Sequence, residues 1–339
     1  MPRERGFWVV LASLIVAGLV ASFFGGRPRT VRLTLSPEAP PLVAQTATAR
    51  SWREARFERI AAIPAGETLP LRNPTLLRLD GRGNLYVLDS GESQVERYTL
   101  DGQPGAVYGP ADLGIPSDVA VAEDGTVQVL DPDRRRITVF SSQGAVVRRI
   151  ALDRNVFRIS LDGRNGFVAV LHRSGKHLFQ RFSANGEPGA TFGTFFPEEV
   201  QSSLTADGWI VPSGPDSFVY PLRHVGILAS YTFDGGLRFF RRTIDPLRLP
   251  PVHFDTAGGQ TIGPTEPQAS FSASVVGPDL FVLDASQKDR VIDVYDAATG
   301  SYRWSMHPPE PDARYVVLTA DRLFSASRRG VTIWRRLHL

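Results

Sequence analysis

The hydrophobic positions of this chain fall in short runs separated by glycine-containing and polar turns, and the arrangement repeats along most of its length. The first repeat contains four segments with strand character, Thr75–Asp80, Leu85–Leu88, Val95–Leu100 and Ala106–Tyr108. Leu85–Leu88 has no polar interruption, which is typical of a strand buried on both faces. The pattern therefore predicts four consecutive antiparallel strands per repeat.

The same order of strands and turns returns at a nearly constant spacing. An aromatic residue near the end of the third strand recurs at Tyr98, Phe140 and Phe182, which are 42 residues apart, and then at Tyr231, Tyr295 and Trp334. The first turn of each repeat is expected at Gly83, Gly125, Gly166, Gly208, Asp279 and Asp321. A period of this size with strand signals in every unit marks a repeat architecture such as a β-propeller. We expect an all-β chain with six four-stranded blades, the last of them incomplete.

The missing strand of the last blade is expected to come from the other end of the repeat region. Arg56–Ile63 precedes the first blade and belongs to no repeat, whereas the final repeat ends with Val331–Trp334. Pairing these two segments removes two open sheet edges, which otherwise promote aggregation. The sequence thus predicts a ring that is closed by an N-terminal strand.

Three repeats share a motif in which a buried strand ends in aspartate and an aromatic residue follows one strand later. It stands as Val87-Leu88-Asp89 with Tyr98, Val129-Leu130-Asp131 with Phe140, and Val282-Leu283-Asp284 with Tyr295. This pattern resembles NHL-type repeats over roughly residues 56–339. The resemblance implies a six-bladed β-propeller and leaves the function open, since this fold supports many activities. In the other repeats, His172, Ser213-Gly214 and Ala326 stand in place of the aspartate.

The composition narrows the classes of function. The chain contains no cysteine, which excludes disulfides, thiolate metal sites and cysteine nucleophiles. Its formal charge is +3, and without residues 1–27, which carry three arginines and one glutamate, it is +1 (35 basic against 34 acidic residues). A nearly neutral domain does not favour a nucleic-acid partner. The abundance of arginine over lysine is interpreted as a bias of genomic base composition.

The N-terminal segment Phe7–Phe24 contains no charged residue and follows Arg3 and Arg5. As a helix it would span about 27 Å, close to the bilayer core of about 30 Å. It is expected to be an uncleaved signal anchor that holds the propeller on the extracytoplasmic side of the cell membrane; the alternative is a cleaved signal peptide. The predicted organisation is a transmembrane segment over 1–27, a linker over 28–55 and the propeller over 56–339.

Candidate chemistry is sparse, and no nucleophile elbow, phosphate-binding loop or zinc-protease motif occurs in the sequence. The strand-end acids and the central histidines could converge on a propeller pore and bind a ligand or a metal ion. The structural alternative is that each aspartate caps its own loop and each histidine is an ordinary hydrogen-bonded residue. The candidate ligand-binding residues are Asp89, Asp131, His172, His224, His253 and Asp284.

The repeat spacing fails between Gly208 and Asp279, where it rises to 71 residues. The extra residues are expected near Ser213–Val225 and in a proline-rich loop over 245–269, which could act as a lid or a partner-binding ridge. Two functions remain open. The first is a membrane-tethered scaffold that binds a protein, peptide or glycan. The second is a metal-dependent hydrolase or lyase with its site at the pore, although the absence of catalytic motifs argues against an enzyme.

Overall fold

The computed structural model describes residues 28–163, 166–172, 175–245, 247–256, 259–262, 268–285 and 289–338. The chain divides into two compact units, a smaller one that includes residues 28–33 and 249–262 and a larger one that starts at Thr34 and excludes 249–266. The regular elements of the described residues are all β-strands. The predicted anchor over 1–27 lies outside the described residues, and none of the described segments forms an apolar helix of membrane-spanning length.

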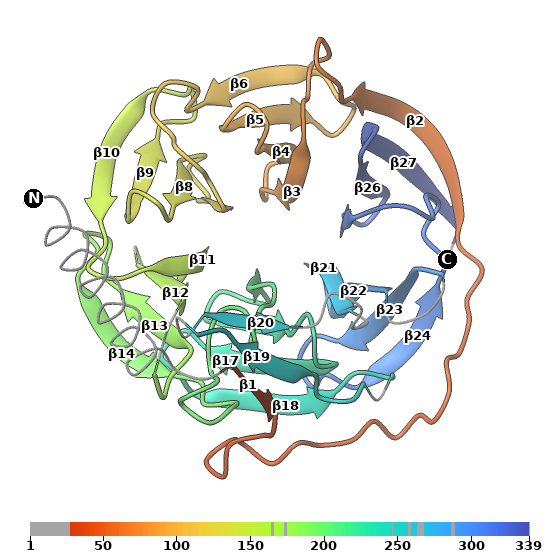
Figure 1. The fold of residues 1–339 in the computed structure, drawn as a ribbon. Helices are drawn as coiled ribbons and strands as arrows, with labels where there is room; N and C mark the ends of the chain where they lie inside the picture. The colour runs from red at the N-terminus through yellow and green to blue at the C-terminus, as the bar shows by residue number, and fades with distance from the viewer. Residues whose placement is uncertain are drawn as a thin grey trace, which may run out of the picture. The chain divides into compact units, whose positions relative to one another are not determined.

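The described part of the larger unit contains six four-stranded antiparallel sheets (Figure 1). Sheet 1 consists of β3 (Pro74–Leu79), β4 (Asn84–Asp89), β5 (Gln94–Thr99) and β6 (Pro104–Tyr108). Sheet 2 consists of β7 (Asp118–Val121), β8 (Val127–Asp131), β9 (Arg136–Phe140) and β10 (Val146–Ala151). Sheet 3 consists of β11 (Val156–Leu161), β12 (Phe167–Leu171), β13 (Phe179–Phe182) and β14 (Pro188–Phe192). Sheet 4 consists of β15 (Val211–Pro212), β16 (Ser217–Pro221), β17 (Ile227–Thr232) and β18 (Leu237–Arg242). Sheet 5 consists of β21 (Gln268–Val276), β22 (Asp279–Ala285), β23 (Val291–Asp296) and β24 (Tyr302–Met306). Sheet 6 consists of β25 (Tyr315–Leu318), β26 (Arg322–Ser327), β27 (Gly330–His338) and β2 (Arg56–Pro64).

The first strand of each sheet lies innermost, and these six strands contact one another in sequence order. Strand β3 contacts β7, β7 contacts β11, β11 contacts β15, β15 contacts β21, β21 contacts β25, and β25 contacts β3 again. The six sheets of the larger unit therefore stand in a closed ring around a central axis (Figure 1). The second strands β4, β12 and β16 are almost wholly buried, as their apolar sequences predict, whereas the outer strand β14 is mostly exposed.

The recurring aromatic residues belong to the core between neighbouring sheets. Tyr98, Phe140, Phe182, Tyr231 and Tyr295 are all buried. Phe140 of sheet 2, for example, packs edge-on against Tyr108 of sheet 1, with ring centroids 5.9 Å apart. Edge-to-face packing of buried rings adds to the stabilisation that their area alone supplies. The sequence period therefore reports one packing position per sheet.

The predicted pairing of the two ends of the repeat region is confirmed. Strand β2 pairs with β27 in antiparallel register, from Arg56 opposite His338 to Pro64 opposite Gly330. The N-terminal strand thereby becomes the outer strand of sheet 6, whose other three strands come from the C-terminus. The hydrogen-bonded ladder thus joins residues that are more than two hundred positions apart in the sequence.

The prediction of a first turn at Gly208 is wrong. The first turn of sheet 4 lies at Ser213–Asp216, between β15 and β16. A Cβ at position 208 would lie 2.5 Å from the carbonyl oxygen of Pro221 and 2.8 Å from the ring of Tyr220, so glycine is required there for close packing. The extra residues of this repeat accordingly lie before β15, in the connection 193–210, and not near Ser213–Val225.

The smaller unit contains a three-stranded antiparallel sheet of β1 (Arg29–Arg32), β19 (Pro251–Phe254) and β20 (Gln260–Ile262). Within it, the guanidinium group of Arg29 lies 4.5 Å from the ring centroid of Phe254. The proline-rich region 245–269, predicted as a loop, therefore contains two strands. Their partner strand, β1, comes from residues that were predicted as part of a linker.

Residues 34–55, predicted as part of a linker, run along the outer strands of sheets 4 and 5; we call this segment the strap. Val43 forms a parallel bridge with Arg241 beside β18, and Trp52 forms one with Ser305 of β24. The side chain of Gln45 donates to the carbonyl oxygens of Arg242 (2.7 Å) and Gly300 (2.8 Å). These bonds cover part of two edges that would otherwise be open to another chain.

The strap is fixed by one largely buried arginine. Arg50 forms ion pairs with Asp245 (2.6 Å) and Asp293 (2.9 Å), and it lies 4.0 Å from Asp284. Burial lowers the pKa of Arg50, but its hydrogen bonds and charge interactions with Asp293 and Asp245 outweigh burial and raise it. Burial raises the pKa of Asp293 above its usual 3.8, although Arg50 and Ser305 oppose this change. Each charge therefore depends on its partner to remain buried.

The ring closure can be tested at Gly330, which has a φ of 123° at the start of β27. A Cβ at this position would overlap the carbonyl oxygen of Ile63, so we expect Gly330→Ala to lower the free energy of unfolding by about 2 kcal/mol or more. Denaturant unfolding measures this loss. The matched control is Gly277→Ala, which also has a positive φ but meets no atom within 4 Å, and it should lose about half as much. Equal losses would contradict the role of the β2–β27 contact.

The strap can be tested with Arg50→Gln, which leaves two largely buried carboxylates without their cation. We expect a loss of about 3 kcal/mol at pH 7. In the variant the folded-state pKa of Asp293 lies further above its unfolded value, so protonation favours the folded state and the deficit should shrink between pH 7 and pH 5. Chemical unfolding at several pH values measures it. Arg56→Gln, at an exposed pair with Glu54, is the control and should change little; a deficit that is independent of pH would contradict the assignment.

Candidate functional site

A cavity of about 580 Å³ opens where the innermost strands of the ring begin. Every one of the six sheets contributes to its lining, either from the inner strand itself or from the residues just before it. The contributions in chain order are Pro74, Ser117, Arg158, Trp209, Phe271 and Tyr315. The cavity therefore lies on the axis of the larger unit, at the end of the channel where these six strands start.

Four arginines line this cavity, and none of its lining residues in the described part of the chain is acidic. We call Arg158, Arg223, Arg290 and Arg314 the arginine cluster. Arg158 lies 4.4 Å from the ring centroid of Trp209, and Arg290 lies 4.9 Å from that of Phe271. Guanidinium groups over aromatic faces are held by attraction to the ring electrons, and they keep their N–H donors at the edge available.

Two members of the arginine cluster share one carboxylate. The guanidinium group of Arg223 lies 3.2 Å from Asp207 Oδ2, and that of Arg158 lies 3.9 Å from Asp207 Oδ1. Arg223 also donates from Nε to the amide oxygen of Gln268 (2.8 Å). Since Asp207 is a single negative charge between two positive ones, this side of the cavity retains a net positive charge.

Arg290 is the least compensated member. Its Nη1 atom is buried and has no hydrogen-bond partner among the described residues. Burial and repulsion by Arg314 lower the pKa of Arg290, while Asp312 opposes them. Asp312 is itself engaged by Arg329 at 2.9 Å. A buried donor without a partner is costly, so an anion entering the cavity would relieve this cost.

A fifth arginine in the same region, Arg78, has partners for its charge and for its hydrogen-bond donors. It forms an ion pair with the buried Asp118 (2.9 Å) and donates to the hydroxyl group of Tyr315 (2.8 Å) and to the carbonyl oxygen of Val119. Burial lowers the pKa of Arg78, but Tyr315 and Asp118 together raise it above its ordinary value. Arg78 is not part of the cavity lining. It links the innermost strands of sheets 1, 2 and 6.

The predicted site residues Asp89 and Asp131 lie at the ends of β4 and β8 and bind backbone groups. Asp89 accepts hydrogen bonds from the amides of Arg72 (2.6 Å), Asn73 (2.8 Å) and Gly91 (2.9 Å). Asp131 accepts one from the amide of Gly114 (2.9 Å). Asp89 therefore binds its own loop through Gly91, as the structural alternative expects, and both carboxylates also hold the connection that precedes the first strand of their sheet.

Asp284 and the three histidines lie in different surroundings. Asp284 belongs to the surroundings of Arg50. His172 Nδ1 lies 2.7 Å from Ser203 Oγ, and His253 Nδ1 lies 2.9 Å from Thr30 Oγ1 in the smaller unit. His224 is half-buried, and burial lowers its pKa. Within the described residues, no three histidine, aspartate or glutamate side chains form a group that could hold a metal ion. The six predicted residues are also absent from the lining of the arginine-lined cavity.

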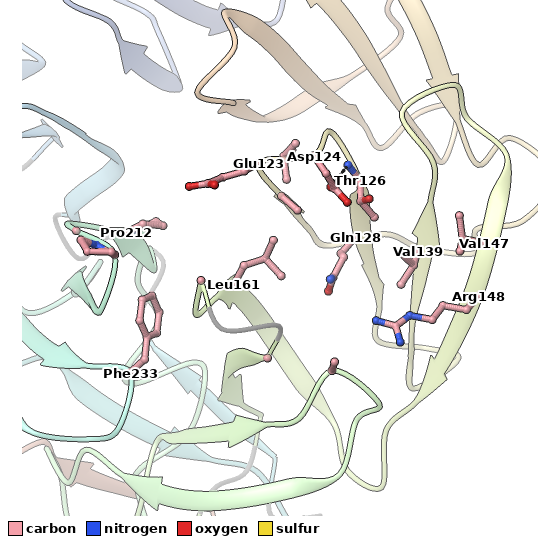
Figure 2. A pocket seen from close by; sticks show the side chains of 17 residues that line it. Glu123, Asp124, Thr126, Gln128, Val139, Val147, Arg148, Leu161, Pro212 and Phe233 are labelled. Atoms are coloured by element: carbon pink, nitrogen blue, oxygen red, sulfur yellow. Dashed lines mark hydrogen bonds between the residues drawn. The ribbon is translucent and has the colours of Figure 1, made fainter.

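A second hollow of about 730 Å³ lies where the inner strands of sheets 2, 3 and 4 end, and thus at the opposite end of the channel (Figure 2). Its labelled side chains include Glu123, Asp124 and Arg148 of sheet 2 and Phe233, which follows β17 of sheet 4. Asp124 binds the amide of Thr126 within its own turn (2.8 Å), which lowers the pKa of its carboxyl group. Charges of both signs are scattered here, so this hollow has less definite chemistry than the arginine-lined cavity.

Sequence reasoning missed the arginine cluster because its members are not neighbours in the chain. Each is a single arginine at a different place in its repeat, and the high arginine content was interpreted as a composition bias. One signal was present. Arg158 lies among Val156, Phe157 and Ile159 in β11, and a charged residue in such a strand indicates a buried cation with partners.

No protein-family model and no curated protein matches the chain. Solved structures similar to it include a protein of Bacteroides fragilis NCTC 9343 (TM-score 0.57, 9% identity, covering 88% of this chain and 99% of that one). Virginiamycin B lyase from Staphylococcus aureus is also similar (TM-score 0.53, 12% identity, 84% and 100%). So is the Cps50 (Swd1) β-propeller domain of Myceliophteria thermophila (TM-score 0.50, 10% identity, 83% and 99%). At these identities the similarity concerns the fold alone, and that fold is the β-propeller.

Proposed function

We propose that this chain is an extracytoplasmic, membrane-tethered, six-bladed β-propeller that acts as a ligand-binding module. The observation that carries the proposal is the cavity on the ring axis, to which all six sheets contribute side chains. Its volume of about 580 Å³ falls in the usual range for ligand pockets of about 300–1,000 Å³. A ring of sheets is suited to this task, because residues from six separate repeats converge at one point on a rigid scaffold.

The repeat type and the number of blades follow from the same features. The six four-stranded sheets and the cyclic contacts of their inner strands support six blades. The strand-end residues Asp89 and Asp131 support NHL-like repeats, since each carboxylate holds the neighbouring loop in the same way. In this view the aspartates build the rim of the ring, and the ligand contacts come from the arginine cluster.

The proposed location rests on the uncharged segment Phe7–Phe24 and the two arginines that precede it. The strap leads from the N-terminal part of the chain along sheets 4 and 5 and is held there by Arg50. A tether that is fixed along the ring, and not only at one residue, limits the positions that the channel can take relative to its point of attachment. The ligand is a protein, peptide or glycan partner, or a smaller molecule, that reaches the channel mouth.

The binding site can be tested by placing a photoreactive amino acid at Thr75, an exposed position in the cavity lining. Illumination of cells that carry the full-length protein should give one discrete adduct, measured by intact-protein mass spectrometry. The matched control is the same replacement at Glu123, which is exposed at the opposite end of the ring (Figure 2). No adduct at Thr75, or an equal adduct at Glu123, would contradict the proposal.

The tether can be tested by membrane fractionation combined with N-terminal sequencing of the purified protein. The full-length chain should remain with the membrane after washing with high salt and alkali, because about 18 apolar residues suffice for insertion. Protease added to the extracytoplasmic side should reach the propeller. A mature N-terminus near Ser22 or Phe23 would show cleavage and remove the anchor from the proposal.

A further inference from the structure

We infer that the cavity binds a small organic molecule with two anionic groups, which are held by two pairs of arginines on either side of Phe271. This inference rests on the proposed function, because it takes the channel mouth as the ligand site. It adds the chemical class of the ligand and the residues that recognise it. The two anionic groups are carboxylates or phosphates, which share the geometry that guanidinium groups bind.

The balance of charges favours more than one anionic group. The arginine cluster supplies four positive charges, Asp207 directly contacts two of its members, and Asp312, which acts on Arg290, is also engaged by Arg329. Among the described residues, an excess of positive charge therefore remains around a cavity of about 580 Å³. Like charges confined in a partly buried space repel one another strongly. A ligand with two anionic groups would neutralise most of this excess.

The arrangement of the arginines separates them into two pairs. Arg158 and Arg223, from the parts of the ring that hold sheets 3 and 4, meet at Asp207. Arg290 and Arg314, from the loops before β23 and β25, lie close enough for each to affect the charge of the other. Phe271 connects the two pairs, because Arg223 lies 5.5 Å and Arg290 lies 4.9 Å from its ring centroid. Two anionic groups on one ligand could therefore contact one pair each, with the ligand lying along Phe271.

Arg290 is the residue on which recognition depends most. Its buried Nη1 atom has no hydrogen-bond partner among the described residues, whereas the comparable Arg78 has three acceptors. A buried donor without an acceptor is unfavourable, and buried nitrogens of Arg136, Arg241 and Arg322 share this state away from the cavity. Arg290 differs from them because its side chain lines the cavity together with Arg314, so its guanidinium group is placed to meet an entering anion.

The middle of the ligand would meet a mixed surface. Its apolar part is formed by Leu76, Leu88, Pro116, Trp209, Phe271 and Tyr315, and its uncharged polar part by Asn73, Thr75 and Ser117. Apolar and aromatic groups beside a few charged ones are typical of a small-molecule site. The aromatic residues give a carbon chain or ring between two anionic groups a surface to contact, which a simple inorganic ion would not use.

The test is isothermal titration calorimetry on the full-length protein in a non-ionic detergent. The probes are glutarate and 1,5-pentanediol bisphosphate, which carry two anionic groups on the same carbon chain, together with butyrate and the neutral glutaramide. We expect one of the two dianions to bind at least tenfold more tightly than butyrate and glutaramide, and which one binds identifies the source as carboxylate or phosphate. Binding should weaken with added salt. Failure of both dianions, or equal binding of glutaramide, would overturn the inference.

The decisive variant is Arg290→Gln, and the matched control is Arg59→Gln, which removes the same charge from an exposed position on β2. Arg290→Gln should weaken binding of the favoured dianion about 10- to 100-fold, while Arg59→Gln should leave it unchanged. The melting temperature of ligand-free Arg290→Gln should equal or exceed that of the wild type, because a half-buried cation with an unpaired buried donor has been removed. A lower melting temperature with unchanged affinity would assign Arg290 a structural role and overturn the inference.

The two proposals fail in distinguishable ways. If the Thr75 photoadduct forms but neither dianion binds to the wild type or to Arg290→Gln, the channel mouth is a ligand site and the proposed anionic class of the ligand is wrong. If no adduct forms at Thr75 and no probe binds, the ligand-binding function itself is wrong. Arg314→Gln provides a second check, since Arg314 is exposed and its loss should weaken dianion binding without affecting folding.

Discussion

The pairing of β2 with β27 is the constraint on which the rest of the larger unit depends. A ring of sheets is not stable when it is open at one sheet, because the gap would expose sheet edges and the apolar faces of the two neighbouring sheets. The pairing joins the strand after the strap to the last strand of the chain, so that every inner strand has a neighbour on both sides. Only in a closed ring do the six inner strands surround one axis and bring their first residues together at one cavity.

The arginines of this ring fall into two groups, which differ in whether acidic or hydroxyl partners balance their charge. Arg50 lies between Asp245 and Asp293, and Arg78 lies between Asp118 and Tyr315, so both have partners that compensate for burial. Such pairs rigidify a structure without adding much net stability. Arg290 and its neighbours in the arginine cluster have one directly shared carboxylate and an unused donor. In the proposed function, the arginines that lack such partners are the ones that contact the ligand.

The strap gives the N-terminal part of the chain a defined course along two sheets. Its bonds to Arg242, Gly300 and Ser305 satisfy backbone groups at the outer edges of sheets 4 and 5. Arg50 adds a charge contact that is specific in position and dependent on the ionisation of Asp293. The strap therefore behaves as part of the ring and not as a free linker.

The sequence by itself determined the β class, the period of the repeat, the place of most strands and the partner of the N-terminal strand. These are local properties, since alternation, turn residues and buried apolar runs act within a few residues, and the unpaired strand at one end implied the gap at the other. The loop-binding role of Asp89 and Asp131 was foreseeable for the same reason. The misplaced turn at Gly208 shows the limit of this reasoning, because glycine there permits close packing against Pro221 and Tyr220 and not a turn. Only the tertiary structure decided the course of the strap, the partners of Arg50 and the arginine cluster. Its members come from four different parts of the chain, and a cavity on the ring axis exists only once six sheets have closed around it.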